Sequence, residues 1–184
     1  MAFNEVSPKT RSDILILPFT GDEATVWKPG KPVVFLNSPF SEARAAFSPD
    51  GRWLAYDSDE SGRFEVYVRP FPGPGGKWQI STAGGSLPTW SRGRGEIIYL
   101  AEGGRIIMAA PYTVEGASFR AEKPRVWSPG LVPLRGSGRT FDLHPDGERV
   151  AVLKASGDEA GDAWDHVILI QNFFDELRRI APSM

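Results

Sequence analysis

The stretch FSPDGRWLAYDSDESGRFEVYVRPF, residues 47–71, contains two short runs whose alternate residues fall on opposite faces of an extended chain. A period of two over runs as short as RWLAYDS (52–58) and RFEVYVRPF (63–71) predicts β-strands. The turn-rich DESG between them predicts a hairpin, and PDG (49–51) is a tight-turn signature. With ARAAF (43–47) before and KWQIS (77–81) after, the stretch predicts four consecutive antiparallel strands.

The acidic DSDESG segment of this stretch also begins like a calcium loop. Asp57, Asp59, Ser61 and Gly62 take positions 1, 3, 5 and 6 of an EF-hand-like loop. Position 12 requires a bidentate glutamate, but it is Val68, and the residues leading to it are predicted strand. The segment is therefore predicted to be a hairpin and not a metal site.

The four-strand unit recurs along the chain. Phe47 and Trp90 are 43 positions apart, and Trp90 and Leu143 are 53 apart. The second unit contains PTWSRGRGEIIYL, GRIIMAAPY and PRVWS, and the third contains FDLHPDGERVAVLKA and HVILIQ. A repeat of about 40–45 residues with four strands is typical of β-propeller blades.

The predicted fold is therefore all-β, a partial β-propeller of about three and a half four-stranded antiparallel blades in one domain, 1–184. DILILPF and KPVVFL are predicted to be the last two strands of an incomplete first blade. In QNFFDELRRIAP, apolar residues at i, i+4 and i+7 predict a short amphipathic helix. The predicted parts are a half blade at 13–36, blades at 43–81 and 86–128, a three-stranded blade at 139–171, and a C-terminal helix at 172–181.

FSPDGRWLAY (47–56) and the weaker LHPDGERVAV (143–152) resemble the repeat of the TolB-like β-propeller family. In that repeat, S-P-D-G-x-x-hydrophobic-A/V-hydrophobic marks the first hairpin of a blade. The middle copy, WSRGRGEIIYL (90–100), departs from it by replacing P-D-G with Arg92, Gly93 and Arg94.

DESGRFEVYVRPFPGPGGKWQIS (59–81) resembles segments of propellers fused C-terminally to bacterial serine/threonine kinases, and FFDELRRIAP (173–182) resembles the ending of those chains. The resemblance covers nearly all of residues 13–182. It implies a sensor or interaction module, often outside the membrane while the kinase lies inside. The chain has no Gly-rich nucleotide loop, HRD or DFG, so kinase activity is not implied. The resemblance supplies no catalytic residues.

Composition excludes several classes of function. The 184 residues contain no cysteine, which excludes disulfides and thiolate metal sites. A net charge of −2 argues against nonspecific nucleic-acid binding, which needs a clustered positive field. No apolar run reaches the roughly 18 residues of a membrane helix, and MAFNEVSPKT does not resemble a signal peptide, so a soluble chain without an export signal is expected.

Candidate site residues are few. Five arginines near the starts of predicted strands and turns are candidates to line a channel mouth and attract anionic groups, although such residues are more often simply solvated. They are Arg44, Arg92, Arg94, Arg135 and Arg139.

Catalytic and metal-binding residues are not predicted. There is no G-x-S-x-G elbow. His144 and His166 lack a convincing carboxylate partner and make a weak zinc case. Trp53 and Trp90 are predicted to pack in the core and not to form a stacking surface. No cofactor or metal is expected.

The sequence favours a noncatalytic protein- or ligand-binding module, with a hydrolase or lyase acting in the propeller channel as the alternative. Since propellers typically close with four to eight blades, an incomplete one leaves an exposed edge. We expect two chains to complete a propeller as a homodimer. The alternatives are that the chain needs a missing propeller half, or that residues 1–10 fold back to complete the last blade.

Overall fold

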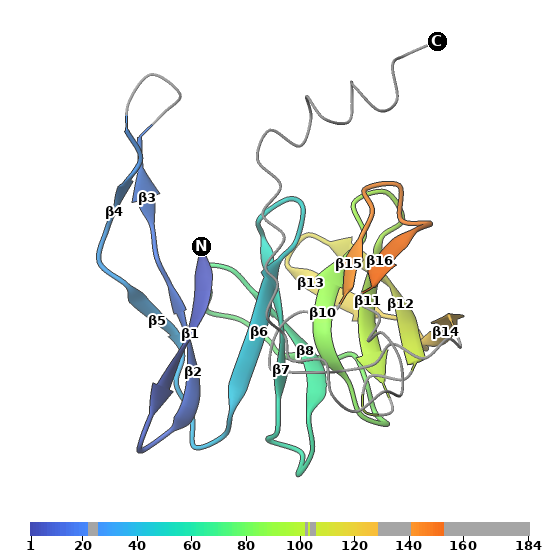
Figure 1. The fold of residues 1–184 in the computed structure, drawn as a ribbon, viewed down its shortest axis with the longest axis horizontal. Coiled ribbons are helices and arrows are strands. Elements are labelled where there is room, and N and C mark those ends of the chain that lie inside the picture. Colours follow the sequence, from blue (N-terminus) through green and yellow to red (C-terminus); the bar gives the residue numbers. More distant parts are fainter. Residues whose placement is uncertain (22–25, 102, 104–105, 129–140, 153–184) are drawn as a thin grey trace, which may run out of the picture.

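The structure, a computed structural model, describes residues 1–21, 26–101, 103, 106–128 and 141–152. In these residues strands β1 to β16 form a series of antiparallel sheets that follow one another in chain order across the molecule (Figure 1). The predicted all-β class is confirmed. The predicted helix at 172–181 and the strand HVILIQ lie outside the described residues.

The second sheet consists of β6 (Glu42–Phe47), β7 (Trp53–Ser58), β8 (Glu65–Pro70) and β9 (Trp78–Gln79), hydrogen-bonded in that order. These are the four strands predicted from residues 43–81. β7 and β8 pair in register from Trp53–Pro70 to Ser58–Glu65, so DSDESG forms a hairpin as predicted.

The third sheet differs from its prediction in one element. It contains β10 (Ser86–Trp90), β11 (Glu96–Ala101), β12 (Ile106–Glu115), β13 (Ser118–Ala121) and β14 (Arg125–Ser128). PRVWS forms the outer strand β14 as predicted, paired with the first half of β12. The second half of β12 continues past Tyr112 and turns back at Gly116 to pair with β13, a hairpin that the sequence analysis missed.

The first sheet has three strands, β1 (Ala2–Ser7), β2 (Arg11–Ile16) and β5 (Val33–Leu36), with a small hairpin of β3 (Phe19–Thr20) and β4 (Lys28–Pro29) above it. The predicted pairing of DILILPF with KPVVFL is confirmed as β2 with β5. β1 was not predicted. Residues 2–7 pair with β2, so they belong to the first sheet. The alternative that residues 1–10 fold back to complete the last blade is therefore wrong.

Apolar side chains fill the space between successive sheets. Leu54 and Tyr56 of β7 face the first sheet, while Trp53 and Ala55 face the third, as the alternation predicted. Ile98 and Leu100 of β11 likewise pack against Phe141 of β15 (Phe141–Leu143), which pairs with β16 (Val150–Val152). Trp53 and Trp90 are 2% and 6% exposed, so both are core residues as predicted.

Candidate functional site

Three turns of the same construction join the first two strands of the second sheet, the third sheet and the β15–β16 hairpin. In each, a backbone N–H at the start donates to the carbonyl that closes the turn. The pairs are Ser48 N to Trp53 O at 2.9 Å, Ser91 N to Glu96 O at 2.8 Å, and His144 N to Arg149 O at 2.9 Å. Ser48, Ser91 and His144 therefore hold equivalent places, as the sequence repeat predicted.

Glycine is needed in the first and third of these turns. Gly51 and Gly147 have φ of 69° and 72°, in the left-handed region that side chains with a Cβ rarely adopt. Each donates its N–H to the carbonyl of the turn's first residue, at 2.9 Å. The PDG signature thus predicted the conformation of these turns as well as their position.

The three turns border one cleft of about 750 Å³. Its lining includes Phe47 and Ser48 from the second sheet, Trp90 and Arg92 from the third, and Asp142 and His144 from the hairpin. The volume is within the range of small-molecule sites, which combine apolar walls with a few polar groups. The chemistry of this cleft therefore comes from three segments distant in sequence.

The Ser48 hydroxyl in this cleft is engaged within its own turn. It donates to Asp50 Oδ1 at 2.5 Å and accepts from the Trp53 N–H at 3.0 Å. The bond from Ser48 is the main cause of the lowered pKa of Asp50. The hydroxyl therefore caps its own turn, with its hydrogen held by the Asp50 carboxylate of that turn.

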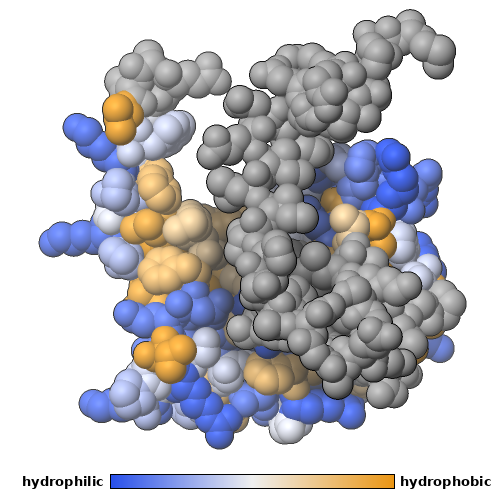
Figure 2. Space-filling model, viewed as in Figure 1, coloured by the Kyte–Doolittle hydropathy of each residue, from blue (hydrophilic) through white to orange (hydrophobic). Residues whose placement is uncertain are grey.

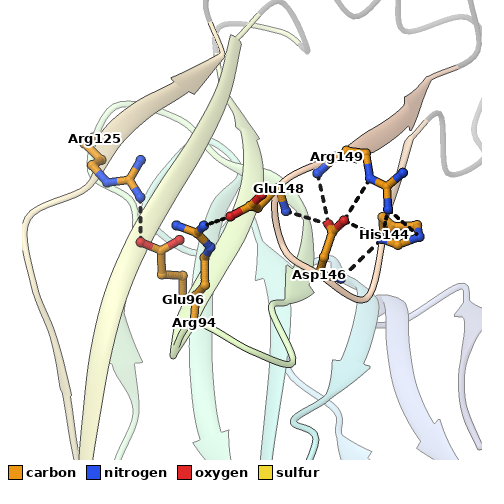
Figure 3. Close-up of polar contacts among 7 residues, drawn as sticks. All are labelled: Arg94, Glu96, Arg125, His144, Asp146, Glu148 and Arg149. Atoms are coloured by element: carbon orange, nitrogen blue, oxygen red, sulfur yellow. Dashed lines mark hydrogen bonds and ion pairs between the residues drawn. The ribbon is translucent and has the colours of Figure 1, made fainter.

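His144, at the rim of the cleft, is also held by its own hairpin (Figure 3). Its Nδ1 lies 2.9 Å from Asp146 Oδ2, and Arg149 Nη2 lies 3.3 Å from both ring nitrogens. Asp146 accepts hydrogen bonds from the Glu148 N–H and from the side chains of Arg149 and His144, which lower its pKa. Arg94 pairs with Glu148 and so ties the Ser91 turn to this hairpin.

The three described arginines among the predicted site residues lie in different places. Arg92 lines the cleft, is exposed, and has no hydrogen bond or ion pair with the described residues. Arg94 pairs with Glu148 beside the cleft. Arg44 lies near a separate depression of about 250 Å³, with its guanidinium 5.3 Å from the centre of the Phe64 ring. Arg135 and Arg139 lie outside the described residues.

Arg44 belongs to a joint between the second and third sheets. Its Nη1 lies 3.0 Å from both carboxylate oxygens of Asp57, whose side chain is fully buried. Asp57 Oδ2 also accepts the N–H of Leu87 at 2.9 Å. Burial nevertheless raises the pKa of Asp57 to about 6, against the opposing effects of Arg44 and the Leu87 N–H.

The same joint exists between the first and second sheets. Arg44 and Leu87 have φ of 55° and 54° and lie in matching bulges of β6 and β10. The Arg44 N–H donates to Asn4 Oδ1 at 3.2 Å. Asn4 pairs with Ile14 on β2 as Asp57 pairs with Val66 on β8, and DILILPF aligns with EVYVRPF, so Asn4 and Asp57 are equivalent.

The structure assigns polar partners to the acids of DSDESG. Asp57 pairs with Arg44, Asp59 accepts from the Ser41 N–H and from Arg11, and Glu60 pairs with Lys77. Among the described residues, no three His, Asp or Glu side chains form a cluster that could hold a metal ion. His166 lies outside that part of the chain.

No protein-family model matches the chain, and no curated protein matches it. In the described part of the chain, no helix is long and apolar enough to cross a membrane.

Of the residues that form the joints and the cleft, the sequence predicts Arg44 and Arg92 as candidates but not their partners or neighbours. The expectation that His144 lacks a carboxylate partner is wrong, because its Nδ1 lies 2.9 Å from Asp146 Oδ2. Its place in the S-P-D-G position of the repeat was the signal that it lines the same cleft as Ser48. For Asp57 the sequence predicts only a place in the DSDESG hairpin and no partner on another sheet. Its pairing with Arg44 and the Leu87 N–H depends on a bulge, which has no signature in this sequence.

Proposed function

We propose that this chain is a noncatalytic binding module, built as a partial β-propeller of about three and a half blades, with its ligand site in the cleft between the three turns. The observation that carries the proposal is the repetition of one turn in three successive units around one cleft. In a propeller, equivalent turns surround one mouth of the central channel, where ligands commonly bind.

Binding is favoured over catalysis by the state of the polar groups at the cleft. Ser48 and His144 are both held by hydrogen bonds within their turns, which suits structural roles. Arg92 is exposed and has no partner among the described residues, so it can contact an anionic ligand group without breaking an existing ion pair. Phe47 and Trp90 supply apolar lining.

Ligand-observed NMR with small carboxylates, phosphates and acidic peptides tests this proposal. We expect the compounds that bind to lose at least tenfold in affinity for Arg92→Gln. Arg120→Gln is the matched control, because Arg120 is an exposed arginine of the third sheet that does not line the cleft. Equal binding to both variants, or no binding by any compound in the panel, would contradict the proposal.

The alternative function is a hydrolase or lyase with its site in the same cleft. The observation in its favour is the 2.9 Å contact between His144 and Asp146, because a carboxylate can orient an imidazole for proton transfer. Turnover of a panel of ester, glycoside and uronate substrates, abolished in His144→Gln, would support the enzyme and oppose the binding module. Arg149 lies 3.3 Å from a ring nitrogen of His144, and this contact favours a structural role for His144 over the enzyme.

We also propose that two chains associate to complete the propeller. The far face of the first sheet carries an apolar row in which Phe3 and Val34 flank Leu15, and no described strand covers this face. Leu15 at the centre of the row is 7% exposed, so the exposed apolar surface lies toward the edge strand. Val33 and Val34 on the edge strand are 59% and 57% exposed. Figure 2 shows apolar surface over this sheet. Exposed apolar edges of this kind favour association.

Light scattering on a sizing column tests the assembly. A stable mass near twice 20.2 kDa across a wide concentration range would support the homodimer. A stable monomer would contradict it and would favour the rival partner, a missing propeller half. The family resemblance further supports a role as the sensor or interaction part of a bacterial signalling protein, outside the cytoplasm.

A further inference from the structure

At the acidic corner where the β5–β6 connection passes the start of β2, two buried carboxylate oxygens accept no hydrogen bond from the described residues. Asp13 and Glu42 are 4% and 3% exposed. Asp13 Oδ2 accepts from Thr10 Oγ1 at 2.7 Å and from Asn37 Nδ2 at 3.4 Å, and Ser38 Oγ donates to Glu42 Oε1. Asp13 Oδ1 and Glu42 Oε2 are buried and have no hydrogen-bond partner in the part of the chain that the structure describes.

The equivalent corner of the second sheet shows what the first corner lacks. In the second sheet, Glu65 takes the place that Asp13 has in the first, and Ser81 takes the place of Asn37. Glu65 accepts from Ser81 Oγ, from the Gly84 N–H at 2.9 Å and from Arg63 Nε at 2.8 Å, so both of its oxygens are satisfied and its charge is balanced.

The first corner has one carboxylate more and one cation fewer. Arg11 aligns with Arg63 but reaches Asp59 instead, at 2.8 Å. Glu42 aligns with Gly85 and adds a second carboxylate. No hydrogen bond or ion pair joins a described Lys or Arg side chain to Asp13 or Glu42, and Lys77 pairs with Glu60. Burial raises the pKa of Glu42, the hydrogen bond from Ser38 opposes this rise, and repulsion from the charges of Asp13 and Glu60 adds to it.

We propose that this corner binds a calcium ion between Asp13 and Glu42. The two carboxylate oxygens without a described partner supply hard, anionic ligands. Thr10, Asn37 and Ser38, whose side chains contact the other oxygens of the two carboxylates, also carry neutral side-chain oxygens. Two carboxylates with neutral oxygens and water suit the flexible, oxygen-only coordination of Ca²⁺ better than that of transition metals, which favour histidine or thiolate. This site is separate from the DSDESG hairpin and from the cleft.

Thermal unfolding of the calcium-stripped chain with and without 5 mM CaCl₂ tests the proposal. A site of millimolar affinity or better raises the midpoint by about 3 °C or more, because the ion binds the folded state. Asp13→Asn and Glu42→Gln should abolish the rise. Glu65→Gln, at the satisfied corner, should lower the midpoint but keep the rise.

Isothermal titration of the wild-type chain with CaCl₂ gives a second measurement that does not depend on the variants folding. One bound ion per chain, reversed by a chelator, is the expected result. No heat and no shift up to 10 mM CaCl₂, with Glu42→Gln more stable than wild type at pH 7, would overturn the proposal and show that the repulsion is relieved by a shared proton. A rise that persists in both corner variants would also overturn it.

Discussion

The joint between the first and second sheets can be compared, residue for residue, with the joint between the second and third. Both use a side-chain oxygen on one sheet to accept the N–H of a bulge residue on the next. The acceptor is the neutral amide of Asn4 in the first joint and the buried carboxylate of Asp57 in the second.

One geometric requirement is thus met by two chemistries that have different consequences. A bulge residue with positive φ points its N–H out of its own sheet, so an acceptor must come from a neighbour. Asn4 supplies the acceptor without a charge. Asp57 supplies it with a charge, which Arg44 then balances and which makes the second joint dependent on pH.

Removing the acceptor from the second joint should have the largest effect. Asp57→Ala leaves the Leu87 N–H unsatisfied and Arg44 without its partner, and should lower the free energy of unfolding by about 3 kcal/mol. Asp57→Asn imitates Asn4, keeps the acceptor, and should cost about 1 kcal/mol. Urea unfolding of both variants measures the difference. Equal losses of unfolding free energy in the two variants would mean that the hydrogen bond from the Leu87 N–H does not stabilise the joint.

The pH dependence of the second joint follows from the raised pKa of Asp57. Because its pKa is about 6 when folded and 3.8 ordinarily, the folded state binds the proton more tightly between these values. The contribution of this group to the free energy of unfolding therefore falls as pH rises, by about 2 kcal/mol from pH 4.5 to 6.5. Asp57→Asn lacks this contribution.

Urea titrations of wild type and Asp57→Asn across that pH range check this expectation. The stability of the wild type relative to the variant should decline steadily from pH 4.5 to 6.5. Parallel pH profiles would show that Asp57 is ionised throughout and that the joint is not sensitive to pH.

Disrupting the first joint should have a smaller effect. Asn4→Ala removes the acceptor for the Arg44 N–H and a donor to Glu42 O at 2.8 Å, and should cost about 1.5 kcal/mol. Val6→Ala on the same strand is the control, since Val6 is 83% exposed and should change stability by less than about 0.5 kcal/mol. If both variants lose the same stability, the loss comes from β1 as a whole.

Two arginines should give the smallest effects, in a definite order. Arg44→Ala should cost about 1 kcal/mol at pH 7, because Asp57 loses its cation, and less at pH 4.5 where Asp57 is protonated. Arg92→Ala should cost less than about 0.5 kcal/mol, because Arg92 has no partner among the described residues. Thermal unfolding at both pH values distinguishes the two, and the reverse order would contradict the assigned joint.

Local pattern predicted the strands well where each strand met its neighbour through a short turn. The second sheet follows from alternation and turn residues alone, and β14 follows from repetition. β1 was missed because AFNEVS places only Ala2 and Asn4 against the second sheet and leaves Val6 exposed, so it has no clear apolar face. The β12–β13 hairpin was missed because TVEGASF looked like an ordinary connection.

Local sequence pattern is enough to specify the all-β class, the repeating unit and the turns, because a period of two and the PDG signature act through neighbouring residues. Only the tertiary structure decides which oxygen accepts each bulge N–H and which of the described arginines lines the cleft. It also decides that Asp57 is buried, which makes its ionised form less favourable and raises its pKa. These outcomes depend on the distance between sheets. Asn4 and Arg44 become neighbours, and Ser48 and His144 come to line one cleft, only after the sheets have packed together.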